Sequence, residues 1–527
     1  MSDNVLEQER LALGIELGST RVKAVLVDER GVSLAGGSHE WRSNLVDGHW
    51  TYGLDEVWQA VQGAVAGLRA DFESRHGAAL NRVGAVGVSA MMHGYLAFDE
   101  AGELLTPLRT WQDTTTAEAA QVLSQLFNIN IPMRWSVAHL YQAILDEEAH
   151  VPEIAFCTTL AGYVHWQLCG EKVLGVGDAS GMVPIDPATG SYDQTRLDSF
   201  SGLVAERALP WKLGDILPKV LNAGQNAGTL TAEGAALLDP SGQLQPGAVM
   251  APPEGDAGTG MVATNTIRPA TANISAGTSI FAMVVLEEQL QAMHEELDPV
   301  TTPDGKPVVM VHCNNGAADL QDWVMLFGEA AQLLGAEFDT DTLFSTLYEK
   351  SLEGSVDAEG MVAFNFRAGE PIAAVEEGRP LFVRMPEHRL QLADFMRAHL
   401  YGSFAVLRLG FEVLHSENVR VDEIFAHGGL FRTKGVAQRF LSAALDVPVT
   451  VSETASEGGA WGMALLAAHA LQGGGDLAGW LDEEIFAGDE RSALTATPEE
   501  VAGFDAYMDR YRSALAIQRA AVDALQR

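Results

Sequence analysis

Residues 14–31 read GIELGSTRVKAVLVDERG, and this stretch decides how the rest of the chain is interpreted. An apolar run on each side of its Gly-Ser-Thr-Arg turn predicts a β-hairpin. Glu16 lies inside the first run, where a buried charge is costly unless it is paired, hydrated or bound to a cation. Glu16 therefore faces outward, pairs with Arg21 or Lys23, or holds a metal ion beside the turn.

A similar passage occurs near the middle of the chain. Residues 273–285 read NISAGTSIFAMVV, which again predicts strand, turn and strand. Aligning Gly277 with Gly18 puts Ser275 in the place of Glu16, so the turn is repeated and the acid is not. The repetition favours two related domains, although turns rich in Gly and Ser are common enough for coincidence to remain the alternative.

Helical and strand-like segments alternate along the chain, which is typical of an α/β architecture. Apolar residues at helical spacing predict a helix over residues 53–77, and residues 83–94 read as a buried strand running into a loop. Residues 424–449 read as a strand, a Gly-Gly turn and a helix.

The domain boundary is expected just before the second hairpin, within residues 263–269. This gives an N-terminal domain of residues 1–266 and a C-terminal domain of residues 267–527. The Gly-rich residues 252–261 are expected to form a loop at the seam, and a helical tail is expected to include residues 504–525.

Composition excludes several classes of protein. The chain has 527 residues, 47% of them hydrophobic, with 71 acidic and 33 basic side chains and a formal net charge of −38. Such a surface repels phosphate backbones and anionic lipids, so we expect neither nucleic-acid nor membrane binding. With three cysteines, no C-x-x-C pair, no signal peptide and no membrane-spanning run, we expect a cytoplasmic protein without a disulfide scaffold or structural zinc.

Several common enzyme motifs are missing from the sequence. It has no G-x-x-x-x-G-K-[ST], no H-E-x-x-H and no G-x-S-x-G, and residues 175–181 lack the G-x-G-x-x-G spacing of dinucleotide-binding proteins. The two hairpin turns remain as candidate phosphate-binding elements, because small residues, hydroxyls and exposed N–H groups can wrap oligophosphate oxygens. The alternative is two ordinary turns. The residues concerned are Gly18, Ser19, Thr20, Gly277, Thr278 and Ser279.

Two carboxylates are candidates for phosphoryl-transfer chemistry. Asp256 lies in EGDAGTGM, residues 254–261, where an Asp on a loop could take the proton of an attacking hydroxyl. The alternative is a turn-forming Asp. Glu16 beside a phosphate cradle could hold Mg²⁺, usually through water.

Ligand-binding groups are candidates in three further stretches. SAMMHG supplies Met92 and His93, and RTWQDTTT supplies Trp111 and Asp113. Rings, amides and carboxylates suit a polyhydroxylated ligand, although core packing is the alternative for a lone His or Trp. In AHGGL, the glycines leave room for a flat ring against the backbone, or form a tight strand-to-helix connection; these are Gly428 and Gly429.

The order of these motifs is more specific than any one of them. GIELGSTRVKAV, MMHG, TWQD, GDAGTG, NISAGTS, AHGGL and EGGAWGMALLA occur in that order between about residues 11 and 470. In this the chain resembles the FGGY carbohydrate kinases, of the actin/hexokinase/Hsp70-like superfamily. The resemblance implies an α/β fold of two ribonuclease-H-like (actin-like ATPase) domains flanking a deep interdomain cleft.

The resemblance also implies roles for the candidate residues. Asp256 would be the base that activates the sugar hydroxyl. The N-terminal domain would bind sugar through Met92, His93, Trp111 and Asp113, and the C-terminal domain would bind most of the ATP. The two turns would form the phosphate loops, Gly428 and Gly429 would line the adenosine pocket, and Asp178 or Ser180 would face substrate in the segment LGVGDASGMVPID.

Three departures from the family pattern bear on substrate and metal. Glu16 replaces the usual Asp and is one methylene longer. Ala257 follows Asp256 where xylulose kinases usually have a polar residue. FRAGEPI, residues 366–372, replaces the usual "GER" loop.

The interpretation is an ATP- and Mg²⁺-dependent kinase of a small ketose, such as xylulose or ribulose, acting on a terminal hydroxyl. The alternatives are a kinase for a polyol or sugar acid, such as glycerol or gluconate, and a non-catalytic nucleotide-dependent binding protein on the same fold. The sequence leaves a homodimer open.

Overall fold

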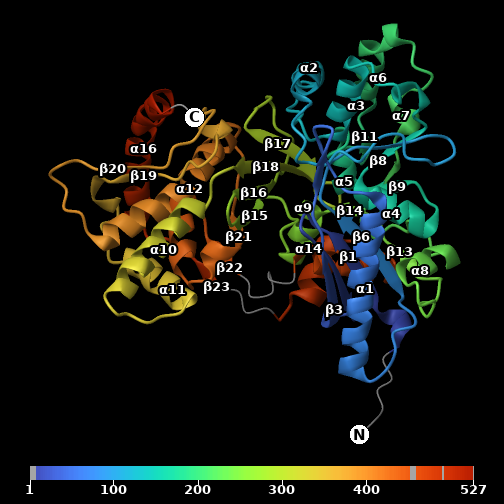
Figure 1. Cartoon of the computed structure of the whole chain (residues 1–527), viewed down its shortest axis with the longest axis horizontal. Coiled ribbons are helices and arrows are strands. Elements are labelled where there is room, and N and C mark those ends of the chain that lie inside the picture. Colours follow the sequence, from blue (N-terminus) through green and yellow to red (C-terminus); the bar gives the residue numbers. More distant parts are fainter. Residues whose placement is uncertain (1–6, 452–457, 489–491, 526–527) are drawn as a thin grey trace. The chain divides into compact units, whose positions relative to one another are not determined.

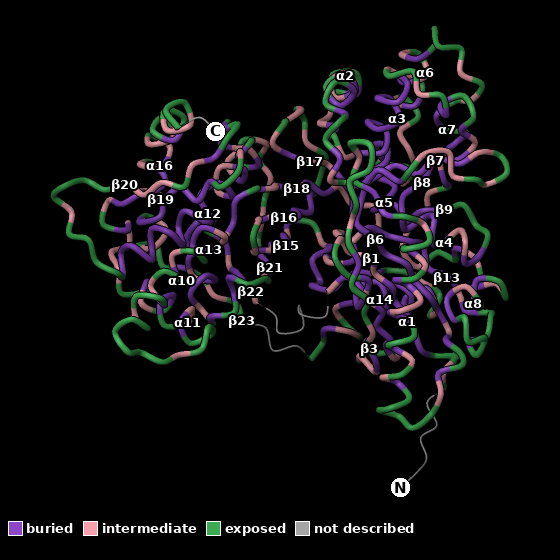
Figure 2. The backbone as a smooth tube through the Cα atoms, in the orientation of Figure 1, coloured by how far each residue is buried: buried purple, intermediate pink, exposed green. Residues whose placement is uncertain are grey.

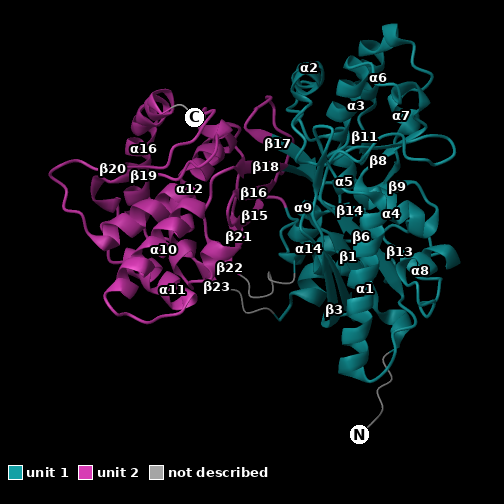
Figure 3. Cartoon of the chain, in the orientation of Figure 1, with its two compact units in different colours: residues 1–268, 298–308, 457–489 teal, residues 269–297, 309–456, 490–527 magenta. Residues whose placement is uncertain are grey.

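The structure is a computed structural model that describes residues 7–451, 458–488 and 492–525. The chain forms two compact units (Figure 3). Unit 1 comprises residues 1–268, 298–308 and 457–489, and unit 2 comprises residues 269–297, 309–456 and 490–527. Glu457 of the EGGAWGMALLA motif lies outside the described residues.

Unit 1 is built on a mixed sheet with the strand order β13-β6-β1-β2-β3 (Figure 1). β1 and β2 form the antiparallel hairpin predicted from the opening stretch, and β1 runs parallel to β6 on its other side. The bounds are β1 (Ala12–Leu17), β2 (Arg21–Val27), β3 (Ser33–Glu40), β6 (Ala85–Ala90) and β13 (Val249–Met250), and β14 (Glu254–Gly255) also pairs with β6.

Two helices cover this sheet, and glycines let them approach the strands closely. The predicted helix over residues 53–77 is confirmed as α1 (Leu54–His76), which packs on β3, where a Cβ on Gly37 would lie 2.1 Å from the Ala64 carbonyl oxygen. α14 (Gly458–Leu471) packs on β1, where a Cβ on Gly14 would lie 2.2 Å from the Ala460 carbonyl oxygen. Side chains alternate along a strand, so Glu16 lies on the same face of β1 as Gly14, toward α14. Figure 2 shows β1, β6 and α14 as mostly buried.

The remaining α-helices and strands of unit 1 surround this layered centre. They are β4 (Asn44–Val46), β5 (His49–Thr51), β7 (Leu96–Phe98), α2 (Ala117–Phe127), α3 (Ser136–Leu145), β8 (Phe156–Thr158), α4 (Leu160–Cys169), β9 (Val173–Gly175), α5 (Val176–Ser180), β10 (Ile185–Asp186), β11 (Ser191–Tyr192), α6 (Gln194–Leu203), α7 (Leu213–Ile216), β12 (Lys219–Leu221), α8 (Ala232–Leu238), α9 (Asp256–Ala263) and α15 (Leu477–Trp480).

Unit 2 repeats the plan of unit 1. Its strands include the order β18-β16-β15-β21-β22-β23, in which β15 and β16 form the predicted second hairpin and β15 runs parallel to β21. The hairpin and its parallel neighbour therefore have the same arrangement in both units, as a duplication would produce. The bounds are β15 (Thr271–Ala276), β16 (Ile280–Val285), β18 (Pro307–Cys313), β21 (Glu423–His427), β22 (Val449–Val451) and β23 (Ser492–Leu494).

Long helices carry most of the core of unit 2. α12 (Leu392–Ser416) is buried along most of its length, and its Tyr401 and Phe404 are fully buried. The helical tail, expected after residue 480 and ending in residues 504–525, is confirmed in its last part as α16 (Pro498–Ala524), ahead of which Thr497 and Glu500 form a capping box. The chain before α16 contains β23 and is therefore not helical throughout. The other elements are α10 (Ala318–Leu333), α11 (Thr340–Ser351), β19 (Val362–Phe364), β20 (Leu381–Val383) and α13 (Val436–Leu445). β17 (Leu297–Thr301) pairs with β18, but all of it except Leu297 belongs to unit 1.

The expectation of a loop over residues 252–261 is wrong in its second half. Glu254 and Gly255 form β14, and α9 begins at Asp256. Among the helices within the described ranges, none combines the length and apolarity needed to cross a membrane.

Candidate active site

Glu16 lies near the end of β1, opposite Lys23 in the hairpin and opposite Ser89 in β6. Gly459 at the start of α14 leaves room for it, since a Cβ there would lie 2.4 Å from Glu16 Oε1. Burial raises the pKa of Glu16, while the positive charge of Lys23 and the Ala460 N–H act in the opposite direction. Within unit 1, these interactions therefore offset only part of the cost of burying the charge of Glu16.

Asp256 is the first residue of α9 and is half-buried. Its Oδ1 accepts a hydrogen bond of 3.2 Å from the backbone N–H of Met92. Burial, together with the negative charge of Glu16, raises the pKa of Asp256 to about 6. Unit 1 therefore brings together Glu16, Met92 and Asp256 from three separate motifs, with an Asp that can take up a proton near neutral pH.

The first hairpin turn is braced by aromatic side chains. Gly18 donates its N–H to the Arg21 carbonyl at 3.1 Å, and Tyr52 donates its hydroxyl to the Ser19 carbonyl at 2.6 Å. Trp111 Nε1 donates to Ser19 Oγ at 3.1 Å, and Trp111 is 39% exposed. The structure thus places a half-exposed indole beside the turn, and Thr20 is exposed at its tip.

His93 has a left-handed backbone with φ of 70°, and its ring is buried. Its Nδ1 lies 3.3 Å from the carbonyl oxygen of Gly181, directly after α5. Burial lowers the pKa of His93 to about 3, so the imidazole is neutral at pH 7. A neutral ring can bind a ligand hydroxyl but cannot serve as a cation for a carboxylate or phosphate.

Asp178 lies in α5 and is 1% exposed. Its Oδ2 accepts from the Thr159 hydroxyl at 2.6 Å, whereas its buried Oδ1 has no hydrogen-bond partner among the described residues. Burial raises the pKa of Asp178 to about 7, and Asp256 adds a negative charge nearby. A buried oxygen without a hydrogen-bond donor costs free energy of folding, unless a ligand donates a hydrogen bond to it. Ser180, two residues on, donates to the Gly177 carbonyl at 2.6 Å.

Both carboxyl oxygens of Asp113 have hydrogen-bond partners within the protein. Its Oδ2 lies 2.5 Å from His49 Nδ1, and its Oδ1 accepts from the N–H and the hydroxyl of Thr115. Burial acts to raise the pKa of Asp113, but the Thr115 and His49 hydrogen bonds outweigh it and lower the pKa. In unit 1, Asp113 therefore holds His49 and its own loop in place.

Glu254 is a member of this group that the sequence analysis did not single out. It is 1% exposed, and its two carboxyl oxygens accept from the N–H groups of Gly177 at 3.3 Å and Asp178 at 3.0 Å. Gly175 and Gly177 leave room for it, since a Cβ on either would lie 2.1 or 2.4 Å from its oxygens. Burial raises the pKa of Glu254 to about 8, with a further contribution from Asp178. The only signal for Glu254 in the sequence is that it lies two residues before the candidate base Asp256.

Unit 2 brings the second turn and the Gly-Gly pair together. The carbonyls of Thr278 and Gly277 accept from the N–H groups of Gly316 at 2.7 Å and Ala317 at 2.8 Å, just before α10. Gly428 has φ of 106°, and a Cβ there would lie 2.4 Å from the carbonyl oxygen of Ala276, the last residue of β15. Gly429 begins a short 3₁₀ helix, and no neighbouring atom would obstruct a Cβ there. Gly277 and Gly428 therefore directly follow two adjacent parallel strands, β15 and β21.

The predicted residues thus fall into one group in unit 1 and one in unit 2, and the cleft between domains stays a prediction. Among the described residues there is no cluster of three or more His, Cys, Asp and Glu side chains that could hold a metal ion. Were a magnesium ion to bind here, Glu16 and the nearby Asp256 would offer it carboxylate oxygens, a ligand type that Mg²⁺ prefers.

Comparison with known proteins identifies relatives of this chain. The N-terminal domain model of the FGGY family of carbohydrate kinases matches residues 11–241, and the C-terminal domain model of that family matches residues 272–471. A xylulose kinase of Klebsiella pneumoniae is 27% identical over 195 residues, which are 35% of this chain and 39% of the relative. A xylulose kinase of Escherichia coli is 24% identical over 255 residues, 43% of this chain and 50% of the relative, so the matched part spans half of these relatives or less.

Solved structures share the fold over nearly the whole chain. A xyloylose kinase from Brucella ovis superposes with a TM-score of 0.78 at 20% identity, covering 97% of this chain and 99% of that one. A gluconate kinase from Lactobacillus acidophilus superposes with a TM-score of 0.77 at 18% identity and the same coverage. At these identities the likeness establishes the two-domain actin-like fold. Since the two family models match most of its residues, the chain belongs to the FGGY family of carbohydrate kinases.

Proposed function

We propose that the protein transfers the γ-phosphoryl group of ATP to a terminal hydroxyl of a small ketose such as xylulose or ribulose. The observation that carries the proposal is Asp256, whose Oδ1 is held by the Met92 N–H and whose pKa is raised to about 6. Such a carboxylate is mostly ionised at pH 7 yet basic enough to accept a proton in the transition state.

In the proposed reaction, the sugar hydroxyl oxygen bonds to the γ-phosphorus as its proton passes to Asp256. The bond from the γ-phosphorus to the bridging oxygen breaks, and ADP leaves with the electron pair. Mg²⁺, held by Glu16 through water, would neutralise charge on the phosphate oxygens.

The other residues would bind and orient the two substrates. We assign residues 1–266 to sugar binding and residues 267–527 to ATP binding. Trp111 would cover a C–H face of the sugar, and the unpartnered Oδ1 of Asp178 would accept from one of its hydroxyls. Gly18, Ser19 and Thr20 would bind phosphate from one unit; Gly277, Thr278 and Ser279 would do so from the other, with Gly428 and Gly429 beside the adenosine.

The charge of the site favours a neutral sugar over a sugar acid. Asp178, Glu254 and Asp256 gather around α5 and α9; Asp256 contributes to the raised pKa of Asp178, and Asp178 contributes to that of Glu254. Asp256 is mostly ionised at pH 7 and would repel an anionic group on the substrate, whereas Glu254 is mostly protonated at that pH. His93 offers no compensation, because its ring is neutral at pH 7.

The proposal is tested by measuring ADP release from ATP with xylulose, ribulose, glycerol and gluconate in turn. Release that depends on a ketose, and exceeds that with glycerol or gluconate, supports the proposal. Preference for gluconate or glycerol would reject the ketose. Equal, background-level release with all four would favour a nucleotide-dependent binding protein.

A further inference from the structure

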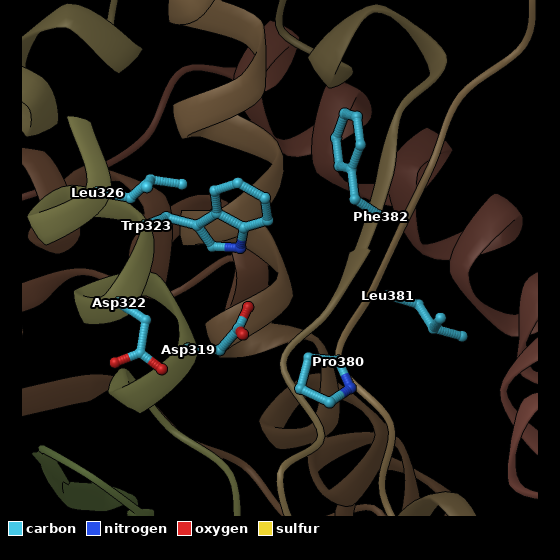
Figure 4. Close-up of a pocket in the computed structure, with 7 residues that line it drawn as sticks. All are labelled: Asp319, Asp322, Trp323, Leu326, Pro380, Leu381 and Phe382. Carbon is cyan, nitrogen blue, oxygen red and sulfur yellow. The ribbon is translucent and has the colours of Figure 1, made fainter. Parts of the chain in front are cut away.

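Unit 2 contains a hollow between α10 and β20 that belongs to none of the motifs considered above (Figure 4). Its volume is about 270 Å³. In Figure 4, Asp319 and Trp323 project from α10 toward the segment that includes β20. The lining residues are Asp319, Asp322, Trp323, Leu326, Pro380, Leu381 and Phe382.

The two aromatic walls of this hollow are supported from behind. Trp323 makes an edge contact with Phe395 at 5.1 Å between ring centroids. Phe382 stacks on His399 at 5.7 Å with an interplanar angle of 14°. Because both supporting residues lie on the buried helix α12, the rings are held in place before any ligand arrives.

Asp319 is a negative charge in the hollow without a full positive partner. It is 7% exposed, and the ion-pair atom facing it is His399 Nδ1 at 3.7 Å. Burial lowers the pKa of His399 to about 3, so this ring is neutral at pH 7. Burial, with the charge of Asp322, raises the pKa of Asp319 to about 6, although a hydrogen bond from the Trp323 side chain and the positive charge of Arg367 act in the opposite direction. Asp319 is therefore mostly ionised at pH 7. Arg367 bonds to Asp322, at 3.3 Å, from an exposed position.

We propose that this hollow binds a small organic cation, with an ammonium or trimethylammonium group beside Asp319 and against the faces of Trp323 and Phe382. A desolvated cation is attracted by aromatic faces and by an ionised carboxylate, and neither attracts an anion. The net charge of −38 also draws cations toward the surface. The inference concerns unit 2 alone and is independent of the proposed kinase activity.

The test compares choline with 3,3-dimethyl-1-butanol, which has the same shape without the charge. Isothermal titration calorimetry on the full chain, with sodium chloride matched to the choline chloride, should show one site for choline. The neutral analogue should bind about tenfold more weakly or not measurably. Asp319→Asn, which keeps the shape of the side chain, should weaken choline binding by about tenfold. Asp341→Asn, which removes an exposed carboxylate of α11, is the matched control and should bind choline like the wild type.

A second variant keeps the test decisive if Asp319→Asn disturbs folding. Trp323→Leu should also lose choline affinity, and the melting temperature of each variant reports whether it is folded. Equal binding of choline and its neutral analogue, or no choline binding at millimolar concentrations, would overturn the proposal. So would a loss of ATP affinity in Asp319→Asn with choline binding unchanged, because the hollow would then belong to the nucleotide site.

Discussion

Replacing Gly462 with Ala tests the packing that positions the candidate base. Gly462 lies in α14, and a Cβ there would lie 2.0 Å from the backbone oxygen of Thr259 in α9. Separating these atoms to 3.0 Å, the shortest distance that real Cβ atoms show, requires a shift of at least 1.0 Å. Because Gly14 in β1 is packed just as closely on the other side of α14, the helix cannot move away freely.

The expected cost follows from this geometry. Overpacking of this kind costs about 1–3 kcal/mol, and the clash with a helix backbone places Gly462→Ala near the upper end. The better helix propensity of Ala returns about 1 kcal/mol. The net loss of about 2 kcal/mol should lower the melting temperature of a unit of this size by about 3 °C. A shift of α9 by 1 Å would also displace Asp256 and lower kcat by up to about 100-fold.

The assay is thermal and urea unfolding, followed by circular dichroism, beside steady-state turnover. Gly202→Ala is the matched control, because it lies in α6 and no atom stands within 4 Å of its new Cβ. The control should be as stable as the wild type, or more stable by up to about 1 kcal/mol. If Gly462→Ala has the same melting temperature as the control and keeps full turnover, the described packing of α9 and α14 is wrong.

Three further predictions concern the carboxylates. Gly459→Ala should displace the carboxylate of Glu16 and the hydroxyl of Thr259, since the new Cβ would lie 2.4 Å from Glu16 Oε1 and 2.8 Å from Thr259 Oγ1. It should raise the Mg²⁺ concentration needed for half-maximal turnover, and an unchanged Mg²⁺ requirement would remove Glu16 from the metal site. Asp178→Asn should raise KM for the sugar by about tenfold and leave KM for ATP unaltered, whereas equal changes in both would point to general damage. Glu254 keeps its proton up to about pH 8 in the folded state but only to about 4.5 when unfolded, so its contribution to stability is lost as pH rises from 5 to 8. Glu254→Gln should flatten that fall, by at most about 1.4 kcal/mol per pH unit in urea titrations, and identical slopes would contradict the shift.

The two hairpins could be predicted because their signals are local. Each consists of two apolar strands around a turn of small residues, and the structure confirms both. The role of glycine in residues 254–261 could not be predicted in the same way. Gly258 and Gly260 lower helix propensity and favour a loop, but tertiary packing of α9 against α14 overrides that preference.

Glu254 and Asp113 show that local sequence patterns do not predict which distant groups a buried side chain will contact. The partners of Glu254 are N–H groups of Gly177 and Asp178, more than seventy residues earlier, and no pattern in the chain connects them. For Asp113, the pattern TWQD gives no sign that its oxygens bond to His49 and Thr115. Both cases depend on which distant backbone or side-chain groups share a buried volume, and this is a property of the tertiary fold.

The most direct test of the central claim compares the wild type with Asp256→Ala in the same assay. Xylulose-dependent formation of ADP and sugar phosphate is measured beside the affinity for ATP. The proposed function predicts that the wild type phosphorylates the ketose, whereas the variant loses phosphorylation and retains nearly all of its ATP affinity. Turnover of the variant equal to that of the wild type would contradict the assignment of Asp256 as the base that takes the hydroxyl proton.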